Sequence, residues 1–259
     1  MNKLIQILLF GIFSSNYLQS EIVLDRFTED KYKPIVFLGI GGNFGHNADE
    51  FIKLYELGFG GNKQEFSNTP NFSIQFKTWL SQKMRTGVSL NYSKIEYFDE
   101  FWTVGRYITR NHTNELSFKR LPIIIKFEFI PYDKQFRSYA GVGFGAMLQQ
   151  IKWHETIRST FELDKRRSAT HFDEFEVSPC VNIYSGLELG FDEYPESYFL
   201  GSLIFEIDYS YFPKKIDIFR KARQVLDVPN SALNKEVSIF ENYFSFTVGI
   251  SFNLLNITK

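Results

Sequence analysis

The chain has 259 residues and a formal net charge of −1, with 44% hydrophobic and 18% aromatic residues. This near-neutral charge gives no electrostatic reason to expect a nucleic-acid partner. A mean hydropathy of −0.20 excludes a protein built from several transmembrane helices, but a transmembrane barrel tolerates it because half of each strand is polar. The single cysteine, Cys180, excludes an intramolecular disulfide framework. At 259 residues one domain is expected, because all-β barrels often reach this size undivided.

The first twenty residues have the features of a secretory signal peptide. Lys3 is followed by a short apolar run from Leu4 to Phe13 and then by small or polar residues. The apolar run is shorter than the roughly 20 residues that a transmembrane helix needs. We therefore predict export through a signal peptide over residues 1–20, cleaved after Ser20, and a periplasmic spacer over residues 21–33.

Eight segments then alternate between apolar and polar residues with the period of two that is typical of β-strands. In chain order they are residues 34–43, 71–80, 85–97, 121–129, 138–149, 177–191, 200–211 and 243–254. The last segment shows the pattern most clearly, because all its even positions are apolar and its odd positions are small or polar. We predict that the apolar faces of the last two segments contact lipid through Phe205, Ile207, Tyr209, Phe244, Phe246, Val248, Ile250 and Phe252.

Three local features carry further expectations. The alternation changes near Ser93 and Lys94, which predicts a β-bulge there. Pro122 cannot donate a ladder hydrogen bond, so we expect it near a strand end or at a bulge. Glycines at 141, 143 and 145 share one face, which leaves room for large side chains from across a narrow barrel.

The connections between the eight segments alternate between long and short. Long polar stretches cover residues 46–70, 100–114, 152–174 and 213–241, and short turns lie between them. This asymmetry is typical of an up-and-down barrel with tight turns at one rim and extended loops at the other. We therefore predict an all-β fold, an eight-stranded antiparallel up-and-down transmembrane β-barrel over residues 34–254 with long loops at one rim.

The polar faces of the strands carry charges at mid-strand positions. These residues are Lys77, Lys126, Glu128, Glu188, Glu206 and Asp208. Because the interior of an eight-stranded barrel is just filled by side chains, we predict a packed network of ion pairs, with a gated ion path as the alternative. Acidic groups outnumber basic ones, so one carboxylate is expected to be protonated or to meet an arginine from a loop.

Taken together, the signal peptide, the eight alternating strands, the glycine-rich fifth strand, the run from Leu121 to Ile125 and the aromatic last strand resemble the small outer-membrane β-barrel proteins of the OmpA-type and PorT-like kind. The resemblance covers residues 33–254. It implies a location in the outer membrane of a Gram-negative bacterium, contact with outer-membrane lipid, and insertion by the barrel-assembly machinery.

Motifs for catalysis and metal binding are weak. His46, His112, His154 and His171 lie in long segments at one rim, but no pair has ligand spacing, so no metal site is predicted. The sequence lacks a nucleophile elbow, a phosphate loop and an HExxH motif, which predicts no catalytic residue and no cofactor. The one hint of acid–base chemistry is the pair Asp173 and Glu174 beside His171. Helical spacing of apolar residues from 218 to 226 predicts a short amphipathic helix over the rim.

These observations favour a non-enzymatic membrane anchor whose rim loops serve adhesion, envelope integrity or assembly with an envelope protein. Two alternatives remain open. One is a small-solute or ion pore, and the other is a soluble lipocalin-like carrier, which would need an apolar interior.

Overall fold

The structure is a computed structural model that describes residues 34–44, 67–81, 83–104, 109–131, 135–159, 166–191, 199–212 and 242–254. The predicted signal peptide, the spacer over residues 21–33 and the predicted helix over 218–226 lie outside these ranges. Among the described residues, no helix is long and apolar enough to cross a membrane.

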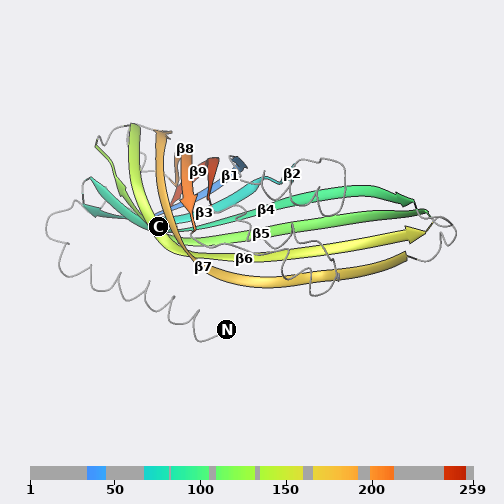
Figure 1. Cartoon of the computed structure of the whole chain (residues 1–259). Coiled ribbons are helices and arrows are strands. Elements are labelled where there is room, and N and C mark those ends of the chain that lie inside the picture. The colour runs from blue at the N-terminus through green and yellow to red at the C-terminus, as the bar shows by residue number, and fades with distance from the viewer. Residues whose placement is uncertain are drawn as a thin grey trace.

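The described residues form a closed antiparallel sheet (Figure 1). Its strands are β1 (Ile35–Phe44), β2 (Ser67–Asn68), β3 (Asn71–Ser81), β4 (Met84–Val104), β5 (Thr109–Phe129), β6 (Phe136–Ser159), β7 (Arg166–Gly190), β8 (Leu200–Tyr211) and β9 (Asn242–Asn253). The eight longer strands each pair with their neighbours in the chain, and β1 pairs with β9 to close the ring, while β2 only adds two residues beside β4. The predicted eight-stranded up-and-down barrel is therefore confirmed.

The register of the strands shows how strongly they tilt. A line of directly paired residues starts at Leu189, passes once around the barrel and returns to β7 at Pro179, ten residues away. Between these two ends it passes through Leu203, Ile250, Leu38, Ile74, Leu90, Ile123 and Ala146. Such a stagger requires strands that tilt by about 35–45° from the barrel axis. Rows of paired residues consequently climb toward the loop rim as they run from β8 through β1 to β7.

The outer face of the barrel is apolar. Of the eight residues predicted to face lipid, Phe205, Ile207, Phe244, Phe246 and Ile250 are exposed, and Tyr209, Val248 and Phe252 are partly exposed. The other six strands add further exposed side chains, among them Leu38, Ile74, Phe76, Ile125, Val142, Phe144, Val181 and Ile183. Because successive side chains of a strand point to opposite faces, the same strands turn their polar residues inward.

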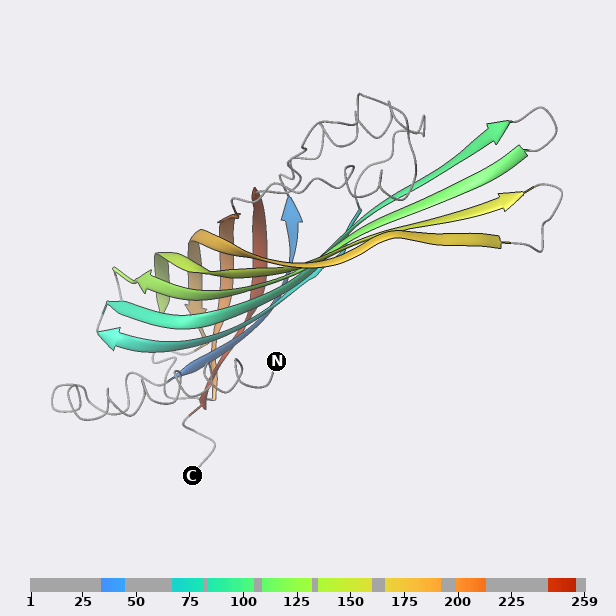
Figure 2. The same ribbon diagram turned by 60° about the horizontal axis from the view of Figure 1, so that its bottom comes forward.

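Four strands are much longer than the rest. The predicted polar loops over residues 100–114 and 152–174 are wrong, because most of these residues belong to β4, β5, β6 and β7. Pairing continues up to Val104 and Thr109 in one hairpin and up to Arg158 and Arg166 in the other. Figure 2 shows the result as a four-stranded projection beyond the ends of β1, β8 and β9. We call it the arm, and define it as residues 94–104, 109–119, 150–159 and 166–180.

The polarity of the two faces inverts where the arm begins. In the arm, the inner face carries the buried apolar side chains of Ile95, Tyr97, Leu116, Phe118, Ile151 and Trp153. The outer face there carries mainly charged or polar residues, among them Lys94, Glu96, Glu115, Lys119 and Lys152, together with the exposed Phe98, Trp102 and Val104 of β4. The β4–β5 register is the same on both sides of Ser93, so the bulge predicted at Ser93–Lys94 is wrong. The sequence pattern changes there because the outer face changes from apolar to charged, not because the strand slips.

Pro122 lies inside the 21-residue strand β5, so the prediction that it sits at a strand end or a bulge is wrong. It keeps its partner Met147 on β6. On the β4 side, pairing stops at Leu90 and Ile123 and resumes at Ser93 and Arg120. The ladder is therefore interrupted at the residue that lacks an N–H group.

The glycines of β6 make room for neighbouring strands and not for the opposite wall, which corrects the prediction. Gly141 is paired with Tyr184 on β7, and a Cβ atom on Gly141 would lie 2.6 Å from the Tyr184 hydroxyl. Gly186 on β7 receives Tyr139 of β6 in the same way, with the Tyr139 hydroxyl 2.4 Å from a built Cβ. Two tyrosines thus lie over two glycines of adjacent strands, inside the barrel.

Candidate functional site

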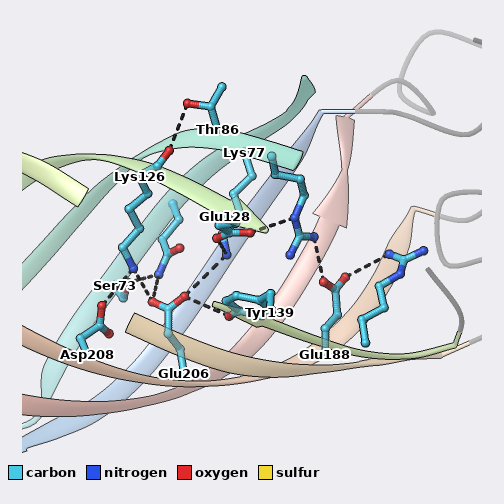
Figure 3. A network of polar contacts seen from close by, with 12 residues as sticks. Ser73, Lys77, Thr86, Lys126, Glu128, Tyr139, Glu188, Glu206 and Asp208 are labelled. Atoms are coloured by element: carbon cyan, nitrogen blue, oxygen red, sulfur yellow. Dashed lines mark hydrogen bonds and ion pairs between the residues drawn. The ribbon is translucent and has the colours of Figure 1, made fainter. Parts of the chain in front are cut away.

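The six charged residues predicted for the lumen all lie inside the barrel. Their relative exposures are between 1% and 3%. Lys126 and Glu128 are two residues apart on β5, and Glu206 and Asp208 are two residues apart on β8, so each pair projects to the same face. Lys77 enters from β3 and Glu188 from β7. Figure 3 shows these side chains meeting in one network, which we call the ionic network.

Glu206 is the most connected member of the ionic network. Its Oε1 accepts hydrogen bonds from Gln75 Nε2 at 2.6 Å and from Lys126 Nζ at 2.5 Å. Its Oε2 accepts a hydrogen bond from the Tyr139 hydroxyl at 2.9 Å and lies 3.6 Å from Lys77 Nζ. Both oxygens of this buried carboxylate are therefore satisfied, as a buried charge requires.

Lys126 connects Glu206 to Asp208. Its Nζ lies 3.1 Å from Asp208 Oδ1, which also accepts a hydrogen bond from Asn182 Nδ2 at 3.1 Å. The ammonium group lies 4.0 Å from the ring centroid of Tyr184, a cation–π contact with a desolvated cation. This lysine of β5 is thus held by two carboxylates from β8 and an aromatic face from β7.

Toward the turn rim, the ionic network continues through Glu128 and Glu188. Lys77 Nζ lies 2.6 Å from Glu128 Oε1, and Arg85 Nε donates to Glu128 Oε2 at 2.9 Å. The same guanidinium donates from Nη1 to Glu188 Oε2 at 2.8 Å. Arg137 Nη1 lies 3.5 Å from Glu188 Oε1, which also accepts a hydrogen bond from Ser202 Oγ at 2.7 Å. Ion pairs therefore run without a break from Asp208 to Arg137.

The two arginines are residues that the sequence analysis missed. One carboxylate was predicted to be protonated or to meet an arginine from a loop, whereas Arg85 and Arg137 are the second residues of β4 and β6 and are buried. With Lys77 and Lys126 they supply four cations against the carboxylates of Glu128, Glu188, Glu206 and Asp208. Strand parity was the available signal, because Arg85 shares a face with Ser89 and Arg137 shares one with Tyr139.

Aromatic side chains fill the space around the charges. Arg85 Cζ lies 5.2 Å from the ring of Trp79 and 5.3 Å from that of Tyr139, and Lys77 Nζ lies 4.7 Å from Tyr139. A buried apolar cluster closes around them, formed by Phe37, Trp79, Ile130, Tyr139, Tyr184 and Ile204. Near the arm, the rings of Phe212 and Tyr243 lie 5.8 Å and 5.1 Å from Arg120 Cζ. Charged and aromatic groups together occupy the described interior.

Changing Gly186 to alanine is expected to lower the free energy of unfolding by about 1–3 kcal/mol, because it overfills this interior. The new Cβ would lie 2.3 Å from Tyr139 Cζ and 2.7 Å from the Phe205 carbonyl oxygen, so Tyr139 would have to leave Glu206. A urea titration in detergent micelles measures the change. Gly42→Ala is the matched control, since nothing lies within 4 Å of its Cβ. Equal stability of the two variants would contradict this packing.

The histidines do not gather into one site. His112 Nδ1 lies 2.9 Å from Glu155 Oε1 and its ring stacks on Phe101, while His154 Nδ1 lies 3.3 Å from Thr170 Oγ1. His46 and the side chain of His171 lie outside what is described. Within the described ranges, no group of three or more His, Cys, Asp or Glu side chains is placed to hold a metal ion.

The remaining candidates have ordinary surroundings. Asp173, the hint of acid–base chemistry, accepts a hydrogen bond from Gln150 Nε2 at 2.7 Å and lies 3.8 Å from Lys152 Nζ. Cys180 is buried on the inner face of β7. Neither residue is arranged with a partner in the way that a nucleophile and its base would be.

No protein-family model matches the chain, and no curated protein matches it in sequence. Among solved structures, it is similar to Neisserial surface protein A, with 10% identity and a TM-score of 0.39 over 85% of this chain and 96% of that chain. It is also similar to Ail, the attachment invasion locus protein of Yersinia pestis, with 8% identity and a TM-score of 0.33 over 86% and 99%. The N-terminal β-barrel domain of Pseudomonas aeruginosa OprF gives 13% identity and a TM-score of 0.33 over 85% and 98%. At these values the likeness transfers no residue role and no activity to this chain.

Proposed function

We propose that the chain is an integral outer-membrane β-barrel protein without enzymatic activity, which anchors the arm outside the membrane. There the arm would serve adhesion, envelope integrity or assembly with an envelope partner. The observation that carries this proposal is the inside-out polarity of the barrel, with apolar side chains outside and the ionic network inside. Because β1 pairs with β9, the barrel also has no open sheet edge between its rims, which is what a hydrocarbon environment demands.

The dimensions of the barrel support insertion in a bilayer. Strands β1, β3, β8 and β9 have 10, 11, 12 and 12 residues. A tilted strand of about 9–11 residues crosses the hydrocarbon region, and the apolar band of such barrels is about 25 Å tall. On β4 the unbroken alternation of outward apolar residues stops after Tyr92 at the charged pair Lys94 and Glu96, which lie 2.5 Å apart; Phe98, Trp102 and Val104 are exposed farther along the arm. The apolar band therefore stops where the arm begins.

The soluble-carrier alternative fits the barrel poorly. A carrier of this kind needs an apolar interior and a polar exterior, but Glu206 and Asp208 are buried while Ile207 between them is 50% exposed. An apolar exterior that continues around the whole barrel exceeds the isolated patches that soluble monomers expose. Fractionation tests this point: the chain should stay with the outer membrane after high-salt and alkaline washing, and release into the soluble fraction would contradict the proposal.

The ionic network supports an anchor over a pore, because its paired charges and aromatic rings occupy the interior. We therefore expect no steady conductance when the purified chain is inserted in planar lipid bilayers. Insertion is verified in the same membranes by protection of the barrel strands from added protease. A steady, large conductance from protease-protected protein would contradict the sealed interior and favour the pore.

Export and assembly are part of the same proposal. We expect the mature chain to begin at Glu21, which N-terminal sequencing of the membrane-bound protein would show. We also expect that cells depleted of the barrel-assembly machinery accumulate the processed chain outside the membrane. Normal insertion in such cells would contradict a role for that machinery.

A further inference from the structure

One edge of the arm is open in the described structure. β7 pairs with β6 from Arg166 down to Leu189, but it pairs with β8 only from Val181 to Gly190. On the side that faces away from β6, residues 166–180 therefore have no strand partner among the described residues. An edge of this kind presents backbone N–H and C=O groups in the spacing that a further strand would pair with.

Two features limit where another strand could pair on this edge. Pro179 has no N–H group to donate. Farther along, the register shifts between Trp153 and His154, which pair with Phe172 and Thr170, so β7 is irregular there. Proline and bulges are the devices by which edge strands avoid association. Residues 173–178 lie between them and contain neither.

The side chains of residues 173–178 are chemically distinct on the two faces. On the outer face, Phe175 is 65% exposed and Val177 is 54% exposed. On the inner face, Glu174 and Glu176 are partly exposed. With Asp173, which lies 3.8 Å from Lys152 Nζ, three carboxylates fall within four residues.

Lipid does not account for the exposed aromatic ring. Phe175 is paired with Gln150, which lies in one row with Lys119 and Lys94. These residues belong to the charged outer face of the arm, and the rows climb away from the apolar band toward β7. Phe175 is therefore exposed at a level where its neighbours are polar, which is typical of a surface that binds another protein.

We propose that residues 173–178 of β7 are a strand-addition site for an extended segment of a partner protein, in which apolar and basic residues alternate. Apolar residues of the segment would lie beside Phe175 and Val177, and basic residues would lie beside the carboxylates of the other face. Backbone pairing supplies the affinity in this mode of recognition, and alternate side chains supply the specificity. The inference goes beyond the proposed anchor and rests on it only in placing the arm outside lipid.

Hydrogen exchange of the full chain in detergent micelles tests the proposal. The probe is a twelve-residue peptide of alternating lysine and valine. Every second amide within residues 173–178 is expected to exchange at least tenfold more slowly when the peptide is present, because alternate residues of an edge point their N–H groups outward. Two control peptides should give no protection: one alternates glutamate and valine, and the other has proline in place of every second valine.

Affinity measurements on variants give a second readout. The change Asp173→Lys with Phe175→Lys should weaken binding of the labelled peptide at least tenfold, by fluorescence anisotropy. The matched control is Glu100→Lys with Trp102→Lys on the opposite edge of the arm, which should leave the affinity unchanged. Should the first variant fail to fold, the comparison of the three peptides on the unmodified chain decides the question.

Three results would overturn the proposal. The amides of residues 173–178 could be fully protected without peptide, which would mean that the chain itself occupies the edge. The peptide could protect residues 97–104 of β4 in their place, or the proline-containing peptide could bind equally well. Because the assay uses micelles, its failure leaves the membrane location untouched, and a failure of membrane insertion leaves the result on this edge intact.

Discussion

Changing Glu206 to glutamine is expected to lower the free energy of unfolding by about 3–5 kcal/mol, the cost of leaving buried charges without their partner. The carboxylate accepts hydrogen bonds from Gln75, Lys126 and Tyr139 and pairs with Lys77. After the change, the two lysines share only the carboxylates of Glu128 and Asp208 inside the barrel. The glutamine amide fills the same volume, so the loss reports on charge and not on a cavity.

A urea titration followed by tryptophan fluorescence measures this effect, since Trp79 and Trp153 are both buried. Glu115→Gln is the matched control, because Glu115 is exposed on the outer face of the arm. Its effect should stay within about 0.5 kcal/mol. If E206Q and E115Q were equally stable, Glu206 would not belong to an ion-pair network that holds the barrel together.

The second large effect concerns the outer face. Changing Ile207 to arginine in lipid vesicles is expected to cost about 2–4 kcal/mol, the penalty for a charge on the lipid face near the middle of the bilayer. Ile207 lies midway along β8 and is exposed. Val104→Arg is the matched control, because Val104 is 82% exposed at the far end of β4 and should tolerate the charge.

Folding both variants into the same vesicles and titrating with urea gives the comparison. In water, an arginine at either exposed position would change stability by no more than about 0.5 kcal/mol. A large loss for I207R together with no loss for V104R therefore requires lipid around the barrel and water around the arm. Equal, small effects would contradict the membrane location.

The barrel could be predicted from the sequence because strand alternation is a local property. The last strand shows this most clearly: Phe246 and Ile250 stand outward while Ser245 and Thr247 are buried, as the period of two requires. The inward charges follow from the same rule, since Glu206 and Asp208 occupy the polar face of an otherwise apolar strand.

The arm could not be predicted from the same alternation, because the apolar residues of one strand face outward in the barrel and inward in the arm. Below Ser93 the apolar residues of β4 face outward, and above it Ile95 and Tyr97 face inward. If the apolar residues are assumed to stay on one face, the alternation ends at Ser93. The polar residues of the outer face then resemble a loop, although Leu116 and Phe118 on β5 continue the inward alternation.

The partners of the ionic network were also beyond local reasoning. Arg85 and Glu188 are separated by 103 residues, and a charge at the start of a strand looks like part of a turn. Likewise, the open edge of β7 becomes visible only when its length is compared with that of β8. Both features depend on register between strands, which a sequence pattern does not specify.

The central claim is that the apolar outer face of the barrel contacts lipid while the arm lies in water. Spin labels on single cysteines at positions 207 and 104, in a Cys180→Ala background and in lipid vesicles, test it most directly. We expect the label at 207 to collide mainly with oxygen, which dissolves in lipid, and the label at 104 mainly with a water-soluble nickel chelate. A label at 207 that meets the nickel chelate as often as the label at 104 would contradict the account.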